Sequence, residues 1–585
     1  MSDYQSIAAR KQQHLESLIP PEWRLNASQI PAGMLSVADS VTNPSYSESI
    51  NVVDIPRTCG LLTPHELHIT EDYDIRSLLT ELHSKRLSAE EVTRAFCKRA
   101  AIAQQLSRCL SEPLFTQALA RARTLDAHLR TTNTPIGPLH GLPISVKDTF
   151  QITGVDATNG LAALAFHPST KDADLVTLLQ SLGVIIITKT NVPQTVSTLD
   201  TANHLFGRTL NPLNRRLTAG GSTGGEAALL ALRGTTLSFG TDIGGSVRIP
   251  PMCVGKYGFK PSQGRLPYGG QQESGHLPAK NSIALQPVAG VMAHSVEDIG
   301  LALGEIVPRA ELFGEDCIPG HWGPSSSLTP TKQKLTIGIL RTDGLVEPLP
   351  PIRNILNEVA TILHHHHHIE LIDLPTPPAL RKCQTIANKL MGVDGGNLMH
   401  DLLEQTNEPL IPWLQGRSKR RNPLTVPELC ELQHQRAQVQ REMMSMWTYT
   451  SPTDKNTGSK KRIDAIIHPV APHPVPEHDK YNAVGYTSSW VLLDYPAGVV
   501  PVRKVTMEDL EVGREMKDPV RGSWDGKNRE LWDEKLVDRH VYLDSPLSVQ
   551  VITPRLHDYE LYTAMGVIDR AVKEHYSKSK DTAKL

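Results

Sequence analysis

Apolar positions along the chain recur with two periods, which predict helices and strands in alternation. An apolar residue every three to four positions predicts a helix, and a short run of branched apolar residues between glycine or proline predicts a strand. In chain order, the expected elements are helices 87–108 and 113–130, strand 143–146, helix 174–182, strand 184–188, helix 226–233, strand 236–239, strand 335–340, helix 352–363 and strand 369–374. Such alternation indicates an α/β protein with a layered sheet covered by helices on both sides.

Single residues mark where several of these helices begin and end. Ser88 and Glu91 have the spacing of a capping box, in which each side chain satisfies a backbone N–H of the other. Gly183 and Gly234 follow the last apolar positions of two later helices. No long linker or repeat divides the 585 residues. We therefore expect one large domain, residues 61–585, with an N-terminal arm, residues 1–60, packed on it.

Two serines lie in glycine-rich segments between residues 219 and 265. Ser222 stands in AGGSTGGE and Ser246 in GTDIGGSVRIP, with Glu226 four positions after the first and Asp242 four positions before the second. Glycine is favoured where the backbone approaches another group closely or adopts dihedral angles that other residues avoid. A serine on such a loop is a candidate nucleophile, because the neighbouring backbone N–H groups can stabilise an oxyanion.

A serine nucleophile needs a base, and Lys147 is the candidate. It ends the apolar segment 143–146 within GPLHGLPISVKD, where a charged residue is unusual for a core position. Burial disfavours the charged form of lysine and lowers its pKa, so that the neutral amine can accept a proton. Lys147, Ser222 and Ser246 thus form a candidate relay.

These motifs resemble the amidase signature family, in its fungal acetamidase or general-amidase branch. The matching blocks, in the order expected for the family, are PLHGLPISVKD, TKTNVPQT, FGRTLNP, GGSTGGE, GTDIGGSVRIP and KYGFKPSQGRLP, and IPPEWRL, FCKRAAIAQQL, IDAIIHPVAP and PLSVQVI extend the likeness over residues 15–575. The resemblance implies the amidase signature fold, a large mixed β-sheet sandwiched between helices. It also implies a serine amidase that converts a small carboxamide to a carboxylate and ammonia or an amine, with no cofactor.

The resemblance further implies roles for individual residues. Ser246 would be the acylated nucleophile, Lys147 the base, and Ser222 the bridge between them, held by a cis peptide bond. Asp242 and Arg248 would brace the nucleophile loop rather than react. The substrate-binding residues that it implies are Val196 on the substrate channel, Ser222, and the backbone N–H groups of Ile243, Gly244, Gly245 and Ser246 as the oxyanion hole.

Two positions depart from the family's pattern. Thr223 stands where relatives often have a second serine, and it keeps the hydroxyl, so we expect loop hydrogen bonds to survive. Thr553, within PLSVQVITPR, stands where relatives usually have glycine. The second departure concerns local backbone geometry near the C-terminus and leaves the three relay residues intact.

Other interpretations of the same residues remain open from the sequence. Glycine-rich serine segments can be simple turns, and Glu226 with Asp242 could be a paired acid and base, although structural roles are favoured for both. Gly220-x-Ser222-x-Gly224 also fits the nucleophile elbow of another hydrolase fold, which would make Ser222 the acylated residue and a histidine its base. An elbow requires a buried strand directly before it, whereas NPLNRRLTA is polar and basic.

Composition and charge limit the classes of partner. The formal charge of −2 leaves no basic excess for nucleic acid, and the short basic segments 416–422 and 454–462 are better interpreted as solvated loops. No apolar run approaches the ~20 residues of a membrane span, and the N-terminus lacks the apolar stretch of a signal peptide. Seven scattered cysteines without CxxC spacing indicate reduced thiols in an intracellular protein.

The remaining expectations concern location, metals and partners. Ala583-Lys584-Leu585 resembles a peroxisomal import signal, so we expect a cytoplasmic or peroxisomal protein. His364–His368 are interpreted as a solvated turn and not as a metal site. An independent amidase, for which a homodimer is a candidate assembly, is one function class. A subunit that delivers ammonia within a larger assembly is the alternative, and the identity of the amide stays open.

Overall fold

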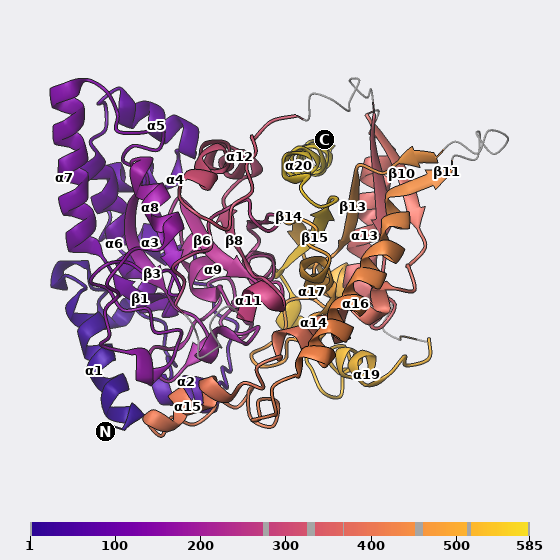
Figure 1. Ribbon diagram of the computed structural model, residues 1–585. Coiled ribbons are helices and arrows are strands. Elements are labelled where there is room, and N and C mark those ends of the chain that lie inside the picture. Colours follow the sequence, from indigo (N-terminus) through magenta and orange to yellow (C-terminus); the bar gives the residue numbers. More distant parts are fainter. Residues whose placement is uncertain are drawn as a thin grey trace.

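An 11-stranded mixed sheet is the centre of the computed structural model, which describes residues 3–272, 280–324, 334–366, 368–450, 460–511, 516 and 518–582. Figure 1 shows the sheet running from β1 across the molecule to β10. In spatial order the strands are β1 (Leu110–Pro113), β3 (Ile185–Thr190), β2 (Pro143–Lys147), β6 (Leu237–Asp242), β8 (Val288–Ala293), β7 (Tyr257–Lys260), β14 (Ala497–Lys504), β15 (Pro546–Ile552), β13 (Ala465–Pro469), β9 (Leu335–Leu340) and β10 (Ile369–Leu374). Strand β2 is parallel to both of its neighbours, β3 and β6, whereas the central strands from β6 to β13 pair in antiparallel fashion.

Helices enclose this sheet, with α12 and α20 above it and α14 and α17 below it in Figure 1. The longer helices are α1 (Tyr4–Ser17), α4 (Pro64–Glu71), α5 (Ile75–His83), α6 (Ala89–Ser107), α7 (Phe115–Thr132), α8 (Asp174–Ser181), α9 (Gly224–Ala231), α12 (Val296–Ile306), α13 (Pro350–His364), α14 (Leu380–Met391), α15 (Asn397–Gln405), α16 (Val426–Met443), α17 (Gly485–Leu492), α19 (Ser523–Glu530) and α20 (Asp558–Thr582). Shorter ones are α2 (Val37–Thr42), α3 (Ile55–Thr58), α10 (Ile249–Val254), α11 (Lys280–Ile283) and α18 (Met507–Glu511). The expected α/β class, a large mixed sheet between helices, is confirmed.

The predicted elements are present, with shifted ends. The strand expected to stop at Phe239 continues to Asp242, and the second predicted helix begins at Phe115 because the preceding residues form β1. Ser88 and Glu91 form the expected capping box of α6. The left-handed residue after α9 is Arg233, not Gly234. Gly234 is needed for packing instead, because a Cβ there would lie 2.3 Å from Leu229 Cδ1.

Residues near the N-terminus, within the predicted arm 1–60, reach into the core. The Lys11 side chain of α1 is only 2% exposed, and its Nζ lies 2.6 Å from Asp156 Oδ2 and forms a second ion pair with Glu112 of β1. Trp23 packs against Phe115 at 5.6 Å between ring centroids. A buried lysine with two carboxylates ties the arm to the sheet, because an unpaired charge would be costly there.

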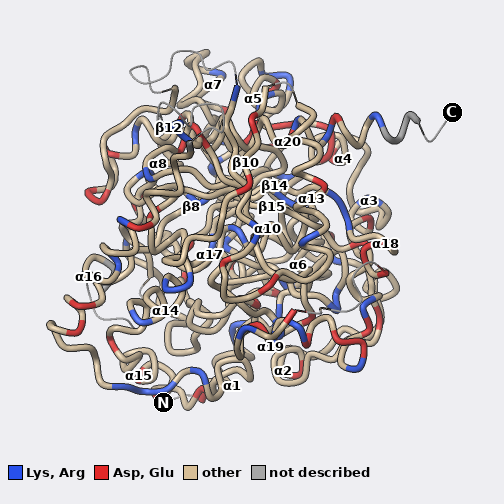
Figure 2. The backbone as a smooth tube through the Cα atoms, turned by 90° about the vertical axis from the view of Figure 1, so that its right-hand side faces the viewer, with Lys and Arg blue, Asp and Glu red and all other residues tan. Residues whose placement is uncertain are grey.

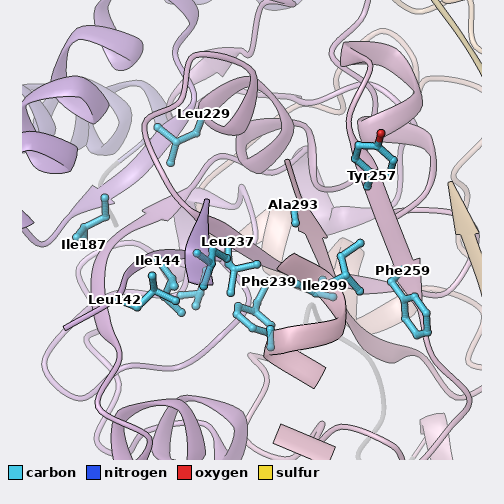
Figure 3. Close-up of a cluster of buried hydrophobic side chains, with 14 of the residues drawn as sticks. Leu142, Ile144, Ile187, Leu229, Leu237, Phe239, Tyr257, Phe259, Ala293 and Ile299 are labelled. Carbon is cyan, nitrogen blue, oxygen red and sulfur yellow. The ribbon is translucent and has the colours of Figure 1, made fainter. Parts of the chain in front are cut away.

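The two faces of β2 and β6 differ in chemistry. Figure 3 shows Ile144 of β2 with Leu237 and Phe239 of β6 in one apolar cluster. Side chains alternate along a strand, so Ser145 and Lys147 leave β2 on the opposite face, where Ser145 pairs with Ser238 of β6. The apolar face anchors the strands, and the polar face carries candidate chemistry.

The surface charges, the helices, the histidine run and the C-terminus concern the expectations about partners, membranes, metals and location. Lys and Arg alternate with Asp and Glu over the outer segments visible in Figure 2. Within the described part of the chain, no helix combines the length and apolarity that crossing a membrane requires. The described histidines of the run at 364–368 lie at the end of α13 and the turn before β10, and His367 falls outside the described residues. So do Ala583, Lys584 and Leu585, whose targeting role stays a prediction.

Candidate active site

The three candidate relay side chains meet at the ends of β2 and β6. Lys147 is the last residue of β2, Ser222 lies two residues before the start of α9, and Ser246 lies in the loop between β6 and α10. Lys147 Nζ lies 2.8 Å from Ser222 Oγ, and Ser222 Oγ lies 3.0 Å from Ser246 Oγ. Both contacts are of hydrogen-bond length, so the three groups form one continuous chain.

Burial sets the protonation state of Lys147. Its side chain is 0% exposed, and burial lowers its pKa to about 7, against the opposing charges of Asp242, Glu226 and Asp148. Half of the amines are therefore neutral near pH 7. A neutral amine has one lone pair, which can accept a proton from Ser222.

Thr241, at the end of β6, is a member of the site that the sequence did not single out. Lys147 Nζ donates a hydrogen bond of 2.8 Å to Thr241 Oγ1. This bond helps to hold the amine beside Ser222. In the sequence, the one signal that connects Thr241 with the candidate site is its position next to Asp242.

The loop that carries Ser222 is packed closely against neighbouring backbone. The Gly221–Ser222 peptide bond is cis, as the family resemblance implies. Thr223 packs its methyl on Gly240 of β6, where a Cβ would lie 2.6 Å from Thr223 Cγ2. Among the described residues, the buried Thr223 hydroxyl has no hydrogen-bond partner. The expectation that this hydroxyl keeps loop hydrogen bonds is therefore wrong, since the methyl makes the contact.

Asp242 and Arg248 hold the loop of Ser246. Both are fully buried, and Arg248 Nε and Nη2 each lie 3.0 Å from an oxygen of Asp242. Asp242 also accepts hydrogen bonds from the backbone N–H groups of Gly245, at 2.7 Å, and Val247, at 3.1 Å. Burial alone would raise the pKa of Asp242, but the charge of Arg248 outweighs it and holds the pKa below its usual range. Both oxygens of this carboxylate are therefore engaged, by the Arg248 guanidinium and by backbone N–H groups of the loop.

These contacts limit which backbone N–H groups are available for the expected oxyanion hole. The Gly245 N–H points at Asp242 and not into the cavity, and the Gly244 carbonyl accepts a hydrogen bond from Thr487. Ile243, Gly244 and Ser246 line the cavity beside the relay. Of the four backbone groups expected to bind an oxyanion, those of Ile243, Gly244 and Ser246 are thus better placed.

A cavity of about 1200 Å³ opens beside the serines. Its wall includes the apolar side chains Val196, Ile243, Tyr268, Met391, Trp413 and Tyr481, and its lining also includes the charged residues Arg417, Lys480, Lys527 and Glu530. Val196 lies on the cavity wall, and its contact with substrate stays a prediction. Its φ of 59°, after 64° at Thr195, is unusual for a β-branched residue, so this wall segment is held in a strained conformation.

The other interpretations fit the structure less well. Residues 219–221, before Ser222, are not in a strand, so the strand that an elbow requires is missing. Asp242 is neutralised by Arg248, which removes it as one half of a paired acid and base. Thr553 has no left-handed backbone, and its hydroxyl donates to the His557 carbonyl at 2.9 Å, so this position does not require glycine.

Comparison with known proteins identifies the family. A sequence model described as Amidase matches residues 91–562. The chain belongs to the amidase family. A fungal protein named acetamidase, from Aspergillus oryzae, is 33% identical over 565 residues, covering 95% of this chain and 96% of the relative. A protein named amidase, from Gibberella moniliformis, is 33% identical over 582 residues, covering 98% and 99%.

Solved structures of other proteins share the fold of this amidase. A fatty acid amide hydrolase aligns with a TM-score of 0.83 at 27% identity, covering 97% of this chain and 95% of that one. A bacterial aryl acylamidase has a TM-score of 0.66 at 20% identity, over 85% and 96%. The family and these relatives make the protein a hydrolase of amide C–N bonds.

Proposed function

We propose that this amidase cleaves a carboxamide through an acyl-enzyme on Ser246, with Lys147 as the base and Ser222 as the bridge. The observation that carries the proposal is the unbroken hydrogen-bonded chain from a fully buried amine through one hydroxyl to a second, at 2.8 and 3.0 Å. The Ser246 hydroxyl is weakly nucleophilic without such a base.

In the proposed acylation step, Ser246 Oγ attacks the amide carbonyl carbon while its proton moves to Ser222. Ser222 passes its own proton to the lone pair of Lys147. The oxygen that becomes negative accepts hydrogen bonds from the backbone N–H groups of Ile243, Gly244 and Ser246, which stabilise it more than they stabilise the neutral carbonyl.

Collapse of the tetrahedral intermediate breaks the C–N bond. The Lys147 ammonium returns a proton through Ser222 to the departing nitrogen, which leaves as ammonia or an amine. Water then attacks the acyl-enzyme, the same relay accepts its proton, and a carboxylate is released. Atoms and charge balance as the hydrolysis of one amide bond.

The cavity supports a small carboxamide as substrate and leaves room for acyl groups larger than acetyl. Its apolar wall suits the acyl side, and the polar relay suits the amide group. Ammonia release by the purified chain alone would support an independent amidase. A strict requirement for a second subunit would instead support the ammonia-delivering alternative.

The proposal is tested by ammonia release from a panel of amides and by mass spectrometry of acylated Ser246. Ser246→Ala should abolish turnover, Lys147→Ala should nearly abolish it, and Ser222→Ala should leave a weak remainder. Ser107→Ala is a matched control, because Ser107 is also buried but donates to a carbonyl within α6. Full activity of Lys147→Ala at neutral pH would show that the base is another group.

A further inference from the structure

Glu226 is a fully buried carboxylate that the proposed relay does not use. It lies in the first turn of α9, four positions after Ser222, and its side chain is 0% exposed. Buried carboxylates are rare unless they are paired or strongly hydrogen-bonded. Burial raises the pKa of Glu226 to about 7, against hydrogen bonds that favour its charged form.

The hydrogen bonds of Glu226 reach the strands around Lys147. Thr190 Oγ1 donates to Glu226 Oε1 at 2.9 Å, and Ser145 Oγ donates to Oε2. Thr190 pairs with Lys147 across β3 and β2, and Ser145 lies two residues before Lys147 on the same face of β2. One carboxylate therefore connects the helix behind Ser222 with the two strands that orient Lys147.

Ser145 extends the connection to the third strand of the site. Its Oγ lies 3.3 Å from Ser238 Oγ on β6, the strand that also carries Thr241, the acceptor of the Lys147 amine. Hydroxyls that donate to both oxygens of Glu226 stabilise its charged form. These hydrogen bonds partly offset the effect of burial and favour a negative charge on the polar face of the sheet.

Charges around Lys147 come from three elements. Asp242 of β6 is neutralised by Arg248, with two bonds of 3.0 Å. Asp148, after β2, accepts hydrogen bonds from Ser111, Thr158 and the Asn159 N–H.

Glu226 of α9 is the third of these charges, and its hydrogen-bond donors are neutral hydroxyls. Lys189 of β3 is a further buried amine, and its Nζ contacts the backbone carbonyl of Asp156. Buried Cys109 also faces Glu226 as a neutral thiol, since burial raises its pKa. The negative charge of Glu226 is therefore available to balance the ammonium that forms on Lys147.

On the basis of the function proposed above, we propose that Glu226 is a positioning residue of the relay. Its carboxylate fixes β2, β3 and α9 around Lys147 through Ser145 and Thr190, and its charge stabilises the Lys147 ammonium that exists between the two proton transfers. It makes no contact with substrate and exchanges no atom with it. Its effect falls on the chemical step and on the protonation of Lys147.

The test compares pH profiles of kcat and kcat/KM for wild type, Glu226→Gln and Glu226→Asp. Glu226→Gln removes the charge, so the ammonium of Lys147 loses stabilisation and its pKa falls. We expect the acid limb of kcat/KM to move down by about one pH unit, and kcat to fall about tenfold or more. KM should change by less than about twofold, because substrate contacts are unaltered. Glu226→Asp keeps the charge and should keep the wild-type acid limb.

Asp298→Asn is a matched control, because Asp298 is also a buried carboxylate and accepts the Ile75 N–H at 3.1 Å. This substitution should leave the pH profiles of kcat and kcat/KM unchanged. If Glu226→Gln does not fold, Thr190→Val removes one donor, leaves Glu226 in place, and should shift the limb in the same direction by less. The inference would be overturned if Glu226→Gln kept the kcat and the acid limb of wild type. The same result in Thr190→Val would overturn it where Glu226→Gln does not fold. Equal shifts of the acid limb in Glu226→Asp and Glu226→Gln would also overturn it. A wild-type protein that cleaves no amide would instead overturn the proposed function.

Discussion

Replacing Lys147 with methionine should stabilise the fold while it removes activity. The side chain is fully buried, and burial lowers its pKa from 10.5 to about 7. In the unfolded chain the amine keeps its ordinary pKa, so at pH 7 the folded protein loses about 4 kcal/mol of stability to this group. Methionine has a similar length and carries no charge. The substitution removes the hydrogen bonds of Lys147 to Ser222 and Thr241, each of which stabilises the fold by about 1 kcal/mol.

The net prediction is a gain of about 2 kcal/mol in the free energy of unfolding at pH 7. The folded pKa lies below the unfolded one, so the cost is complete below pH 7 and declines as pH rises towards 10.5. The gain from Lys147→Met should therefore shrink by about 1 kcal/mol per pH unit between pH 7 and pH 9, and it should vanish near pH 9.

Urea unfolding of wild type and Lys147→Met at pH 7, 8 and 9 measures this difference. Lys535→Met is the control, because Lys535 is exposed and should change stability little at any of these pH values. A Lys147→Met protein that is less stable than wild type at all three pH values would contradict this prediction. It would mean that the folded protein holds Lys147 as a stabilised ammonium.

Three further predictions concern the arm, the loop and the cavity. Lys11→Met leaves Glu112 and Asp156 without their shared cation and should lower the free energy of unfolding by about 3 kcal/mol or more; an unchanged urea midpoint would contradict the anchoring role of the arm. Arg248→Met leaves Asp242 unpaired and should lower both stability and the rate of acylation, whereas loss of acylation alone would indicate direct participation. Along linear amides from acetamide to hexanamide, kcat/KM should rise about fourfold per methylene, and a fall with length would show that the cavity wall does not bind the acyl chain.

Local sequence signals predict part of the fold. Strands β2, β3 and β6 and helices α6 and α8 follow from apolar periodicity and capping residues. The pattern gives no expectation for β1, β7, β8, β13, β14 and β15. Strand β14, for example, is antiparallel to both β7 and β15, and β7 lies more than 200 residues away in the sequence. Such pairings depend on contacts between distant segments, which local periodicity does not carry.

The sequence likewise predicts only some of the residues of the candidate site. Residue type and glycine context single out Lys147, Ser222 and Ser246, and the structure brings these three together. Thr241 and the hydroxyl partners of Glu226 are ordinary strand residues in the sequence. Their importance depends on which strand lies beside which, and that becomes visible only once β2, β3 and β6 are in register.

The most direct measurement of the central claim is the rate of Ser246 acylation as a function of pH in single turnovers, with the acyl-enzyme trapped by acid and quantified by mass spectrometry. If a neutral Lys147 accepts the proton through Ser222, the wild-type rate rises about tenfold per pH unit below pH 7 and levels off above it. The Lys147→Met protein, although well folded, should then acylate at least about a hundredfold more slowly and lack that inflection. An inflection near pH 7 that persists in the Lys147→Met protein, or acylation of Ser222 in place of Ser246, would contradict the account.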